Sequence, residues 1–159
     1  MKLCMVGEGA FANKHLDALV NIAGVEVAAL VGGVAEATEQ AAEKHNIPKW
    51  TLDLEEGLSQ PGIKGVILAT PTPLHASQAQ QVLRSGKHVL VEKPFTLQND
   101  HAEELVRLSE ENNINLMVGH VLLFHPAIKK IKNLIDQNKI GKLQYIYSNR
   151  LNLGQVRTG

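Results

Sequence analysis

Residues 2–12, KLCMVGEGAFA, decide the fold. The apolar run Lys2–Val6 predicts a short buried strand, and the turn Gly7-Glu8-Gly9 follows it at once. After this turn, apolar side chains recur at spacings of three and four residues, which is typical of a helix. A strand, the pattern Gly-x-Gly-x-x-Ala and a helix, in this order, form the fingerprint of a dinucleotide-binding unit.

The small residues of this fingerprint have separate tasks. Gly7 makes the tight turn, and Gly9 has no Cβ that would keep a pyrophosphate away. Ala12 allows the helix to pack closely on the strand, so that the positive end of the helix dipole faces the phosphates. We therefore expect Gly7, Gly9, Phe11 and Ala12 to contact a bound cofactor. A glycine turn with a purely structural role is the alternative.

Further apolar runs alternate with helical patterns along the chain. Strands are predicted at 25–31, 49–51, 65–69, 88–91 and 115–118, and helices at 35–45, 54–58, 74–85 and 99–112. This alternation predicts an α/β fold with a doubly wound parallel sheet, the Rossmann architecture. In such sheets ligands bind at the carboxyl edge, where the strands end.

The pattern changes after His120. A helix is predicted at 127–137, and residues 143–151 alternate like a half-buried antiparallel strand. We interpret residues 1–121 as a dinucleotide-binding domain. Residues 122–159 are expected to be the start of a second, α+β domain whose remainder is absent from this sequence.

The end of the second predicted strand leaves the choice of cofactor open. An acidic residue about 20 positions after the glycines would hold the ribose 2′-hydroxyl of NAD. Here the sequence reads Gly32-Gly33-Val34-Ala35, the nearest acid is Glu36, and no Arg or Lys is present to hold a 2′-phosphate. Gly32 is an expected cofactor contact that admits the adenosine closely, unless it simply belongs to a loop. The cofactor is therefore NAD or NADP.

Polar residues follow two later strands. Thr70, Pro71, Thr72 and His75 come after the strand at 65–69, where two prolines stiffen the loop and the threonines offer hydroxyls. The loop thus offers hydroxyls and a histidine at the carboxyl edge, where ligands bind. For His75, a helix-capping or solvent-facing position is the alternative.

The strand at 88–91 runs into Glu92-Lys93-Pro94. A strand that ends in a lysine directs its ammonium out of the carboxyl edge, and Pro94 turns the chain there. We count Glu92 and Lys93 among the expected cofactor contacts, and Lys93 and His120 among the expected substrate contacts. Ordinary surface charge at the end of a strand is the alternative for Lys93.

Composition narrows the class of protein. The 159 residues hold 16 basic and 16 acidic side chains, so a basic patch for nucleic acid or an anionic membrane is not expected. No segment is long enough to span a bilayer, and the first strand begins too early for a signal peptide. The single cysteine, Cys4, lies in an apolar strand and predicts a buried thiol and a cytoplasmic location. We predict no metal site.

The chain resembles the Gfo/Idh/MocA family of oxidoreductases. The resemblance covers essentially the whole chain and is carried by Gly7-x-Gly9-x-x-Ala12, Ala69-Thr70-Pro71, Glu92-Lys93-Pro94 and Gly119-His120. It implies a nicotinamide-dependent dehydrogenase that acts on a secondary alcohol of a sugar-like molecule, with Lys93 as the catalytic residue. It also implies that Thr70, Pro71, Thr72 and His75 border the cofactor, that a second domain completes the site, and that the protein is a homo-oligomer.

Two parts of the chain resemble different branches of the family. The entry of the second domain is similar to enzymes of UDP-linked N-acetyl sugars, and Leu123 stands where many members carry an arginine. Residues 7–19, GEGAFANKHLDAL, together with residues 47–54, IPKWTLDL, are more similar to a branch that oxidises ring-cleavage products of aromatic acids, which implies a hemiacetal or dihydrodiol as the alternative substrate. A module that binds a dinucleotide without turnover, as a redox sensor or interaction partner, is the alternative function.

Overall fold

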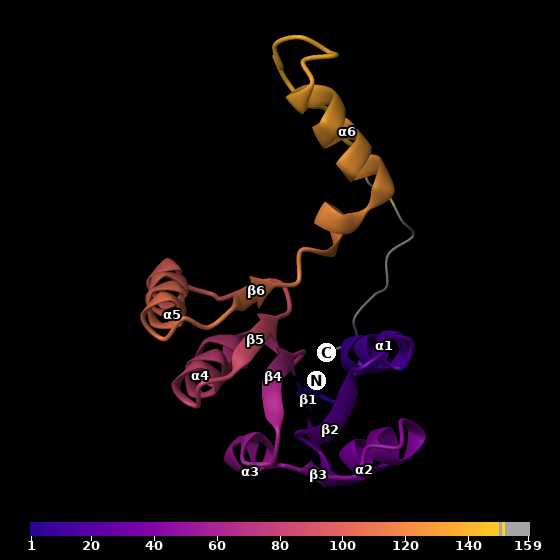
Figure 1. The fold of residues 1–159 in the computed structure, drawn as a ribbon, viewed down its shortest axis with the longest axis vertical. Coiled ribbons are helices and arrows are strands. Elements are labelled where there is room, and N and C mark those ends of the chain that lie inside the picture. The colour runs from indigo at the N-terminus through magenta and orange to yellow at the C-terminus, as the bar shows by residue number, and fades with distance from the viewer. Residues whose placement is uncertain (150, 152–159) are drawn as a thin grey trace. The chain divides into compact units, whose positions relative to one another are not determined.

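A six-stranded parallel sheet forms the centre of residues 1–120 (Figure 1). The structure, a computed structural model, describes residues 1–149 and 151. The strand order is β3-β2-β1-β4-β5-β6, where the strands are β1 (Lys2–Val6), β2 (Glu26–Val31), β3 (Trp50–Thr51), β4 (Ile63–Leu68), β5 (His88–Val91) and β6 (Leu116–Val118). The chain starts in the middle of the sheet and winds outward in both directions. This is the predicted doubly wound α/β fold.

Helices cover both faces of this sheet (Figure 1). Their bounds are α1 (Ala10–Leu19), α2 (Ala35–Lys44), α3 (Leu54–Leu58), α4 (Thr72–Arg84) and α5 (Asn99–Glu111). Side chains of α1 and α2 join one buried cluster, and side chains of α3, α4 and α5 join another. A parallel sheet needs such cover on both sides, because its connections place helices there.

Side chains of β1 alternate between the two buried clusters. Leu3 and Met5 pack with Leu16 of α1, whereas Cys4 and Val6 face the other layer. Burial raises the pKa of the Cys4 thiol to about 12, so the thiolate that would react or bind a metal is scarce at neutral pH. The predicted buried thiol is confirmed.

The chain divides into two units, Met1–His120 and Val121–Gly159. The second contains a 3-10 helix, η1 (Val121–Phe124), and the helix α6 (Pro126–Asp136). His125 caps α6, because its ring Nδ1 accepts a hydrogen bond from the amide of Ala127 at 3.2 Å. No helix of the described residues is long and apolar enough to cross a bilayer.

The prediction of a strand at 143–151 is wrong for the residues in this range that the structure describes. Residues 143–149 and 151 form neither helix nor strand. Alternating apolar side chains make a strand only beside a partner that accepts its hydrogen bonds, and the described part of this unit holds no strand to pair with it. Arg150 and residues 152–159 of the expected second domain lie outside the described residues.

Candidate functional site

Backbone hydrogen bonds tie together the loops at the carboxyl edge of the sheet. In five loops the first amide after a strand donates to the last carbonyl of a neighbouring strand, and we call these bonds the edge row. They are Gly32 N to Thr51 O (3.0 Å), Gly7 N to Val31 O (2.7 Å), Ala69 N to Val6 O (2.8 Å), Glu92 N to Leu68 O (2.9 Å) and Gly119 N to Val91 O (2.8 Å). The edge row therefore holds the loops that carry the predicted site residues in fixed register.

The two glycines of the first loop are needed for different reasons. Gly7 has φ +113°, and a Cβ there would lie 2.7 Å from the carbonyl oxygen of Ala69. Gly9 has φ −72°, and a Cβ there would meet no protein atom within 4 Å. The fold itself requires Gly7 to be glycine, whereas the space beside Gly9 is open at the amino end of α1.

A cleft of about 740 Å³ lies over this turn. Its lining includes six of the predicted cofactor contacts, which are Gly7, Gly9, Phe11, Gly32, Thr70 and Pro71. In doubly wound sheets, a cleft at the ends of the central strands, beside a glycine turn and the amino end of a helix, is where dinucleotides bind.

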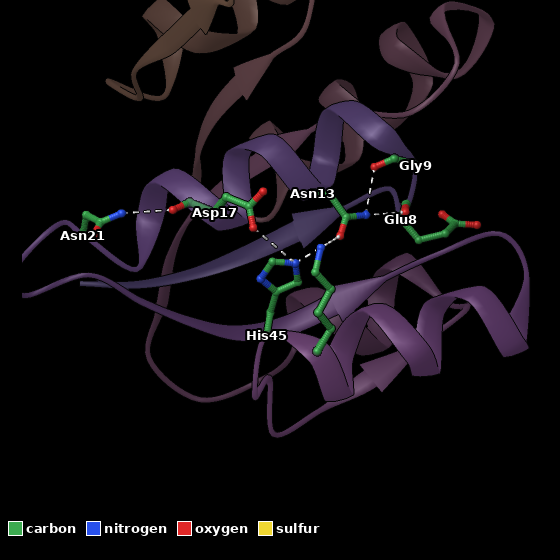
Figure 2. Close-up of polar contacts among 7 residues, drawn as sticks. Glu8, Gly9, Asn13, Asp17, Asn21 and His45 are labelled. Atoms are coloured by element: carbon green, nitrogen blue, oxygen red, sulfur yellow. Dashed lines mark hydrogen bonds and ion pairs between the residues drawn. The ribbon is translucent and has the colours of Figure 1, made fainter.

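Asn13 fastens the glycine turn to its surroundings (Figure 2). Its side-chain amide donates to the carbonyls of Glu8 (2.9 Å) and Gly9 (3.1 Å). Its oxygen Oδ1 lies 3.2 Å from Lys44 Nζ and 3.0 Å from His45 Nε2, near the end of α2. Sequence reasoning missed Asn13, because its position on the first turn of α1 does not reveal that its side chain folds back onto the loop.

Glu8 was also missed, although it lies inside the fingerprint. Its carboxylate oxygen Oε1 accepts hydrogen bonds from the amides of Gly33 and Val34, both at 3.0 Å. The side chain thus crosses from the end of β1 to the end of β2 and borders the cleft. The only sequence signal for this contact is an acidic residue inside the fingerprint combined with the lack of an acidic residue directly after β2.

The loop after β4 is held by hydrogen bonds on both sides. The hydroxyl of Thr70 donates to Gln78 Oε1 at 2.6 Å, and Pro71 lies just before the first residue of α4, Thr72. His75 is 1% exposed, and its ring nitrogens lie 2.8 Å from the carbonyl oxygens of Thr70 and Pro94. The solvent-facing alternative for His75 is wrong. Both ring nitrogens are occupied, so this side chain positions the loop and has no free nitrogen for a ligand.

Glu92 is buried at the end of β5, where it joins three segments. Its Oε1 lies 2.8 Å from His15 Nε2 on α1, and its Oε2 accepts from the amide of Lys93 at 3.1 Å. A Cβ on Gly119 would lie 3.0 Å from this carboxylate. Glu92 thus fixes the backbone at Lys93, and His15 is the partner that sequence reasoning did not identify.

The Lys93 side chain is exposed and turns toward the glycine loop. Its Nζ lies 5.1 Å from the centre of the Phe11 ring, within the range of a cation–π contact. Phe11 itself lines the cleft. The structure therefore brings the predicted catalytic lysine to the border of the predicted cofactor cleft.

Three further predicted site residues, Ala12, Gly32 and His120, differ in their surroundings. Ala12 is fully buried beneath the turn, where it packs between helix and sheet. Gly32 abuts Thr38, because a Cβ would lie 1.8 Å from the threonine hydroxyl oxygen, so packing alone requires this glycine. His120 is exposed, directly after Gly119. Within the described residues, no three His, Cys, Asp or Glu side chains gather as a metal ion would require.

Comparison with known proteins supports this geometry. Residues 1–120 match the Gfo/Idh/MocA family, an oxidoreductase family with an NAD-binding Rossmann fold. The chain is 39% identical over 135 residues to 4-carboxy-2-hydroxymuconate-6-semialdehyde dehydrogenase of Sphingobium sp., an alignment that covers 85% of this chain and 43% of that protein. It is 31% identical over 146 residues to scyllo-inositol 2-dehydrogenase (NAD(+)) of Bacillus subtilis, an alignment that covers 91% of this chain and 43% of that protein.

Among solved structures, scyllo-inositol dehydrogenase of Lactobacillus casei with bound NAD(H) and scyllo-inositol superposes with a TM-score of 0.84. The two are 24% identical, and the superposition covers 89% of this chain and 42% of that one. The chain thus spans about two fifths of the length of these relatives. With the glycine turn, the cleft above it and the match over residues 1–120, the chain belongs to the Gfo/Idh/MocA family of oxidoreductases and carries its NAD-binding Rossmann domain.

Proposed function

We propose that the protein is an NAD(P)-dependent dehydrogenase that transfers a hydride between the nicotinamide and a secondary alcohol of a sugar-like molecule. The observation that carries the proposal is Lys93, whose ammonium lies at the border of the cleft that the fingerprint builds. Family membership supports the reaction class. The scyllo-inositol dehydrogenases among its relatives support a polyol as substrate.

The residues of the cleft fit a dinucleotide. The open space at Gly9 would accommodate the pyrophosphate, and the amino end of α1 would supply amide donors and a positive dipole. Phe11 is the lining residue beside Lys93, so the nicotinamide would be held at this part of the cleft, with Thr70 and Pro71 as further lining residues. When bound, the nicotinamide ring accepts or donates the hydride.

Lys93 handles the proton. In the reduction direction, as an ammonium, it donates a hydrogen bond to the carbonyl oxygen, stabilises the negative charge that develops there as the hydride arrives at carbon, and gives its proton to that oxygen. In the oxidation direction, as an amine, it accepts the hydroxyl proton while the hydride leaves carbon. Glu92 does not share this task, because its carboxylate is buried and bonded to His15 and to the backbone of Lys93. Glu92 is thus a positioning residue, and His120 is a proposed substrate contact.

A second substrate class rests on the relative with 39% identity. Its name gives a muconate semialdehyde as the substrate. The hydrated or hemiacetal form of such an aldehyde also presents a hydroxyl on the carbon that loses the hydride, so the same lysine and cofactor would serve. A UDP-linked N-acetyl sugar is a third substrate to test, because of the resemblance of residues 120–154.

The test is a substitution of Lys93 with two readouts. Binding of NADH and NADPH to this chain is followed by fluorescence titration, and turnover is assayed on the full gene product with a polyol, a UDP-linked sugar and a muconate semialdehyde. We expect Lys93→Met to keep NADH affinity within about threefold and to lower kcat by about 10²–10⁴-fold, as loss of an acid–base group does.

The matched control is Lys64→Met. Lys64 is an exposed lysine near the start of β4, at the opposite edge of the sheet. This variant should turn over like the wild type. Equal turnover by Lys93→Met and Lys64→Met would contradict the catalytic role of Lys93. Saturable cofactor binding without turnover of any substrate would favour a non-catalytic dinucleotide module.

A further inference from the structure

We propose that Glu8 selects NAD over NADP, by taking the place of the acidic residue that usually follows β2. This inference rests on the proposed function, because it concerns the cofactor of the same cleft. In a dinucleotide-binding unit, the end of β2 meets the ribose of the adenosine, and an acid there accepts hydrogen bonds from its hydroxyls. In this chain the end of β2 is Val31, and the residues that follow are Gly32, Gly33 and Val34, none of which can do so.

Glu8 brings a carboxylate to this position from another strand. Its oxygen Oε1 is held at 3.0 Å by the amides of Gly33 and Val34, the two residues where the ribose-binding acid would otherwise stand. Hydrogen bonds from two amides to a carboxylate are charge-assisted and fix its orientation. Oε2 makes no hydrogen bond within the described residues and is free to accept from a ribose hydroxyl.

The geometry of the turn explains how Glu8 reaches so far. Gly7 leaves β1 with φ +113°, and its amide donates to the last carbonyl of β2, Val31 O, at 2.7 Å. The residue after Gly7 therefore starts beside β2 and needs only its own side chain to reach the amides beyond it. The side-chain amide of Asn13 donates a hydrogen bond to the carbonyl of Glu8 at 2.9 Å, which fixes the backbone of this residue (Figure 2).

The charges around the cleft disfavour a 2′-phosphate. Among the residues that line the cleft, Glu8 alone has an ionisable side chain, and it is acidic. The segment 32–43, which contains the start of α2, has no Lys or Arg. The first basic residue beyond it, Lys44, lies in the last turn of α2 with its ammonium on Asn13 Oδ1. A 2′-phosphate adds nearly two negative charges and removes the hydroxyl that Glu8 would bind.

The experiment compares two ligands that lack nicotinamide. ADP-ribose and its 2′-phosphorylated form are titrated into this chain by calorimetry, so that hydride chemistry does not enter. We expect the wild type to bind ADP-ribose at least about tenfold more tightly than 2′-phosphorylated ADP-ribose. Glu8→Gln keeps the length of the side chain and an oxygen for the two amides but loses the charge. The preference should then fall below about threefold.

The matched control is Glu36→Gln. Glu36 is an acidic residue in the first turn of α2, close in sequence to the same loop, but it does not line the cleft. This variant should keep the wild-type preference within about twofold. A second measurement needs no variant. Salt screens the repulsion between Glu8 and a 2′-phosphate. Raising NaCl from 25 to 500 mM should therefore reduce the ratio of the wild type's affinities for ADP-ribose and its 2′-phosphorylated form several-fold.

The outcomes separate this inference from the proposed function. Equal affinity of the wild type for both ligands, or a preference that Glu8→Gln leaves unchanged, overturns the role of Glu8 and leaves the dehydrogenase proposal intact. A preference that salt does not narrow overturns the electrostatic role. Binding of neither ligand overturns both proposals. A preference that depends on Glu8 in a protein without turnover supports this inference while contradicting the dehydrogenase.

Discussion

Gly7 and Gly9 differ in what a side chain would meet at each position. Gly7 combines a positive φ with a carbonyl oxygen 2.7 Å from the site of a Cβ, whereas Gly9 has ordinary backbone angles and empty space. In the sequence the two look alike, since both belong to the same fingerprint. The fold requires a glycine at position 7, whereas the space beside Gly9 is open.

Alanine at the two positions should therefore have opposite effects. We expect Gly7→Ala to lower the free energy of unfolding by roughly 2–4 kcal/mol, because the left-handed backbone and the close contact with Ala69 both cost energy. Gly9→Ala should change it by less than about 0.5 kcal/mol but weaken NADH binding at least about tenfold, since the methyl group would occupy the space that we propose for the pyrophosphate. Urea denaturation and NADH titration measure the two effects. A Gly9→Ala protein that unfolds easily, or binds NADH normally, would contradict this division.

At the scale of elements, His75 connects two loops. It lies on the first turns of α4 and contacts the carbonyl of Thr70, after β4, and that of Pro94, after β5. Its two ring nitrogens each lie 2.8 Å from one of these carbonyl oxygens. One side chain thus contacts both the loop that lines the cleft and the loop that carries Lys93.

Replacing this side chain should loosen both loops. We expect His75→Leu to lower the free energy of unfolding by roughly 1–3 kcal/mol, because it removes the buried ring N–H that donates to a backbone carbonyl. It should also weaken NADH binding, as Thr70 and Pro71 lose their fixed position. His101→Leu, at an exposed site on the first turn of α5, serves as the control and should alter neither quantity. Equal stability of the two variants would show that His75 does not hold the loops.

Periodicity predicted the elements well where burial creates a pattern. Lys2–Val6 and His88–Val91 begin and end as predicted, since strands covered on both faces read as continuous apolar runs. The helix α4 begins at Thr72, two residues before the predicted start, because Pro73 fits the first turn of a helix. Residues 143–149 alternate between apolar and polar side chains like a strand but form none. Alternation predicts which face of a strand would be buried, but it does not supply the neighbouring strand with which to pair.

The site was predictable only in part. The glycine turn, Thr70 and Lys93 were found because each follows a recognisable strand. Glu8 and His15 were not found, because each acts on a residue 25 or more positions away, Gly33 and Glu92 respectively. Such pairs depend on which strands lie side by side, and strand order is decided by the whole fold.

At the scale of the whole molecule, the two units differ in burial. All side chains classed as buried among the described residues lie in Met1–His120. In the second unit, apolar side chains such as Ile128 and Ile131 of α6 are exposed. The core that stabilises the chain is therefore complete within the first unit.

Removal of residues 121–159 should accordingly cost little stability. We expect a protein of residues 1–120 to unfold with a free energy within about 1 kcal/mol of that of the whole chain, because none of the described residues after His120 has a buried side chain. Urea denaturation of the two proteins, monitored by circular dichroism, makes the comparison. A loss of more than about 2 kcal/mol would show that the second unit contributes to the core.

The edge row should tolerate substitutions in the loops but not insertions or deletions before them. Its five hydrogen bonds use only backbone atoms, so the side chains of the loops are free to vary without loosening the frame that holds them. An inserted or deleted residue before any of these amides would instead displace the first residue of that loop and, through the row, disturb its neighbours. Relatives should therefore acquire new substrates by exchanging side chains at the loops, while the spacing from each strand to its loop stays constant.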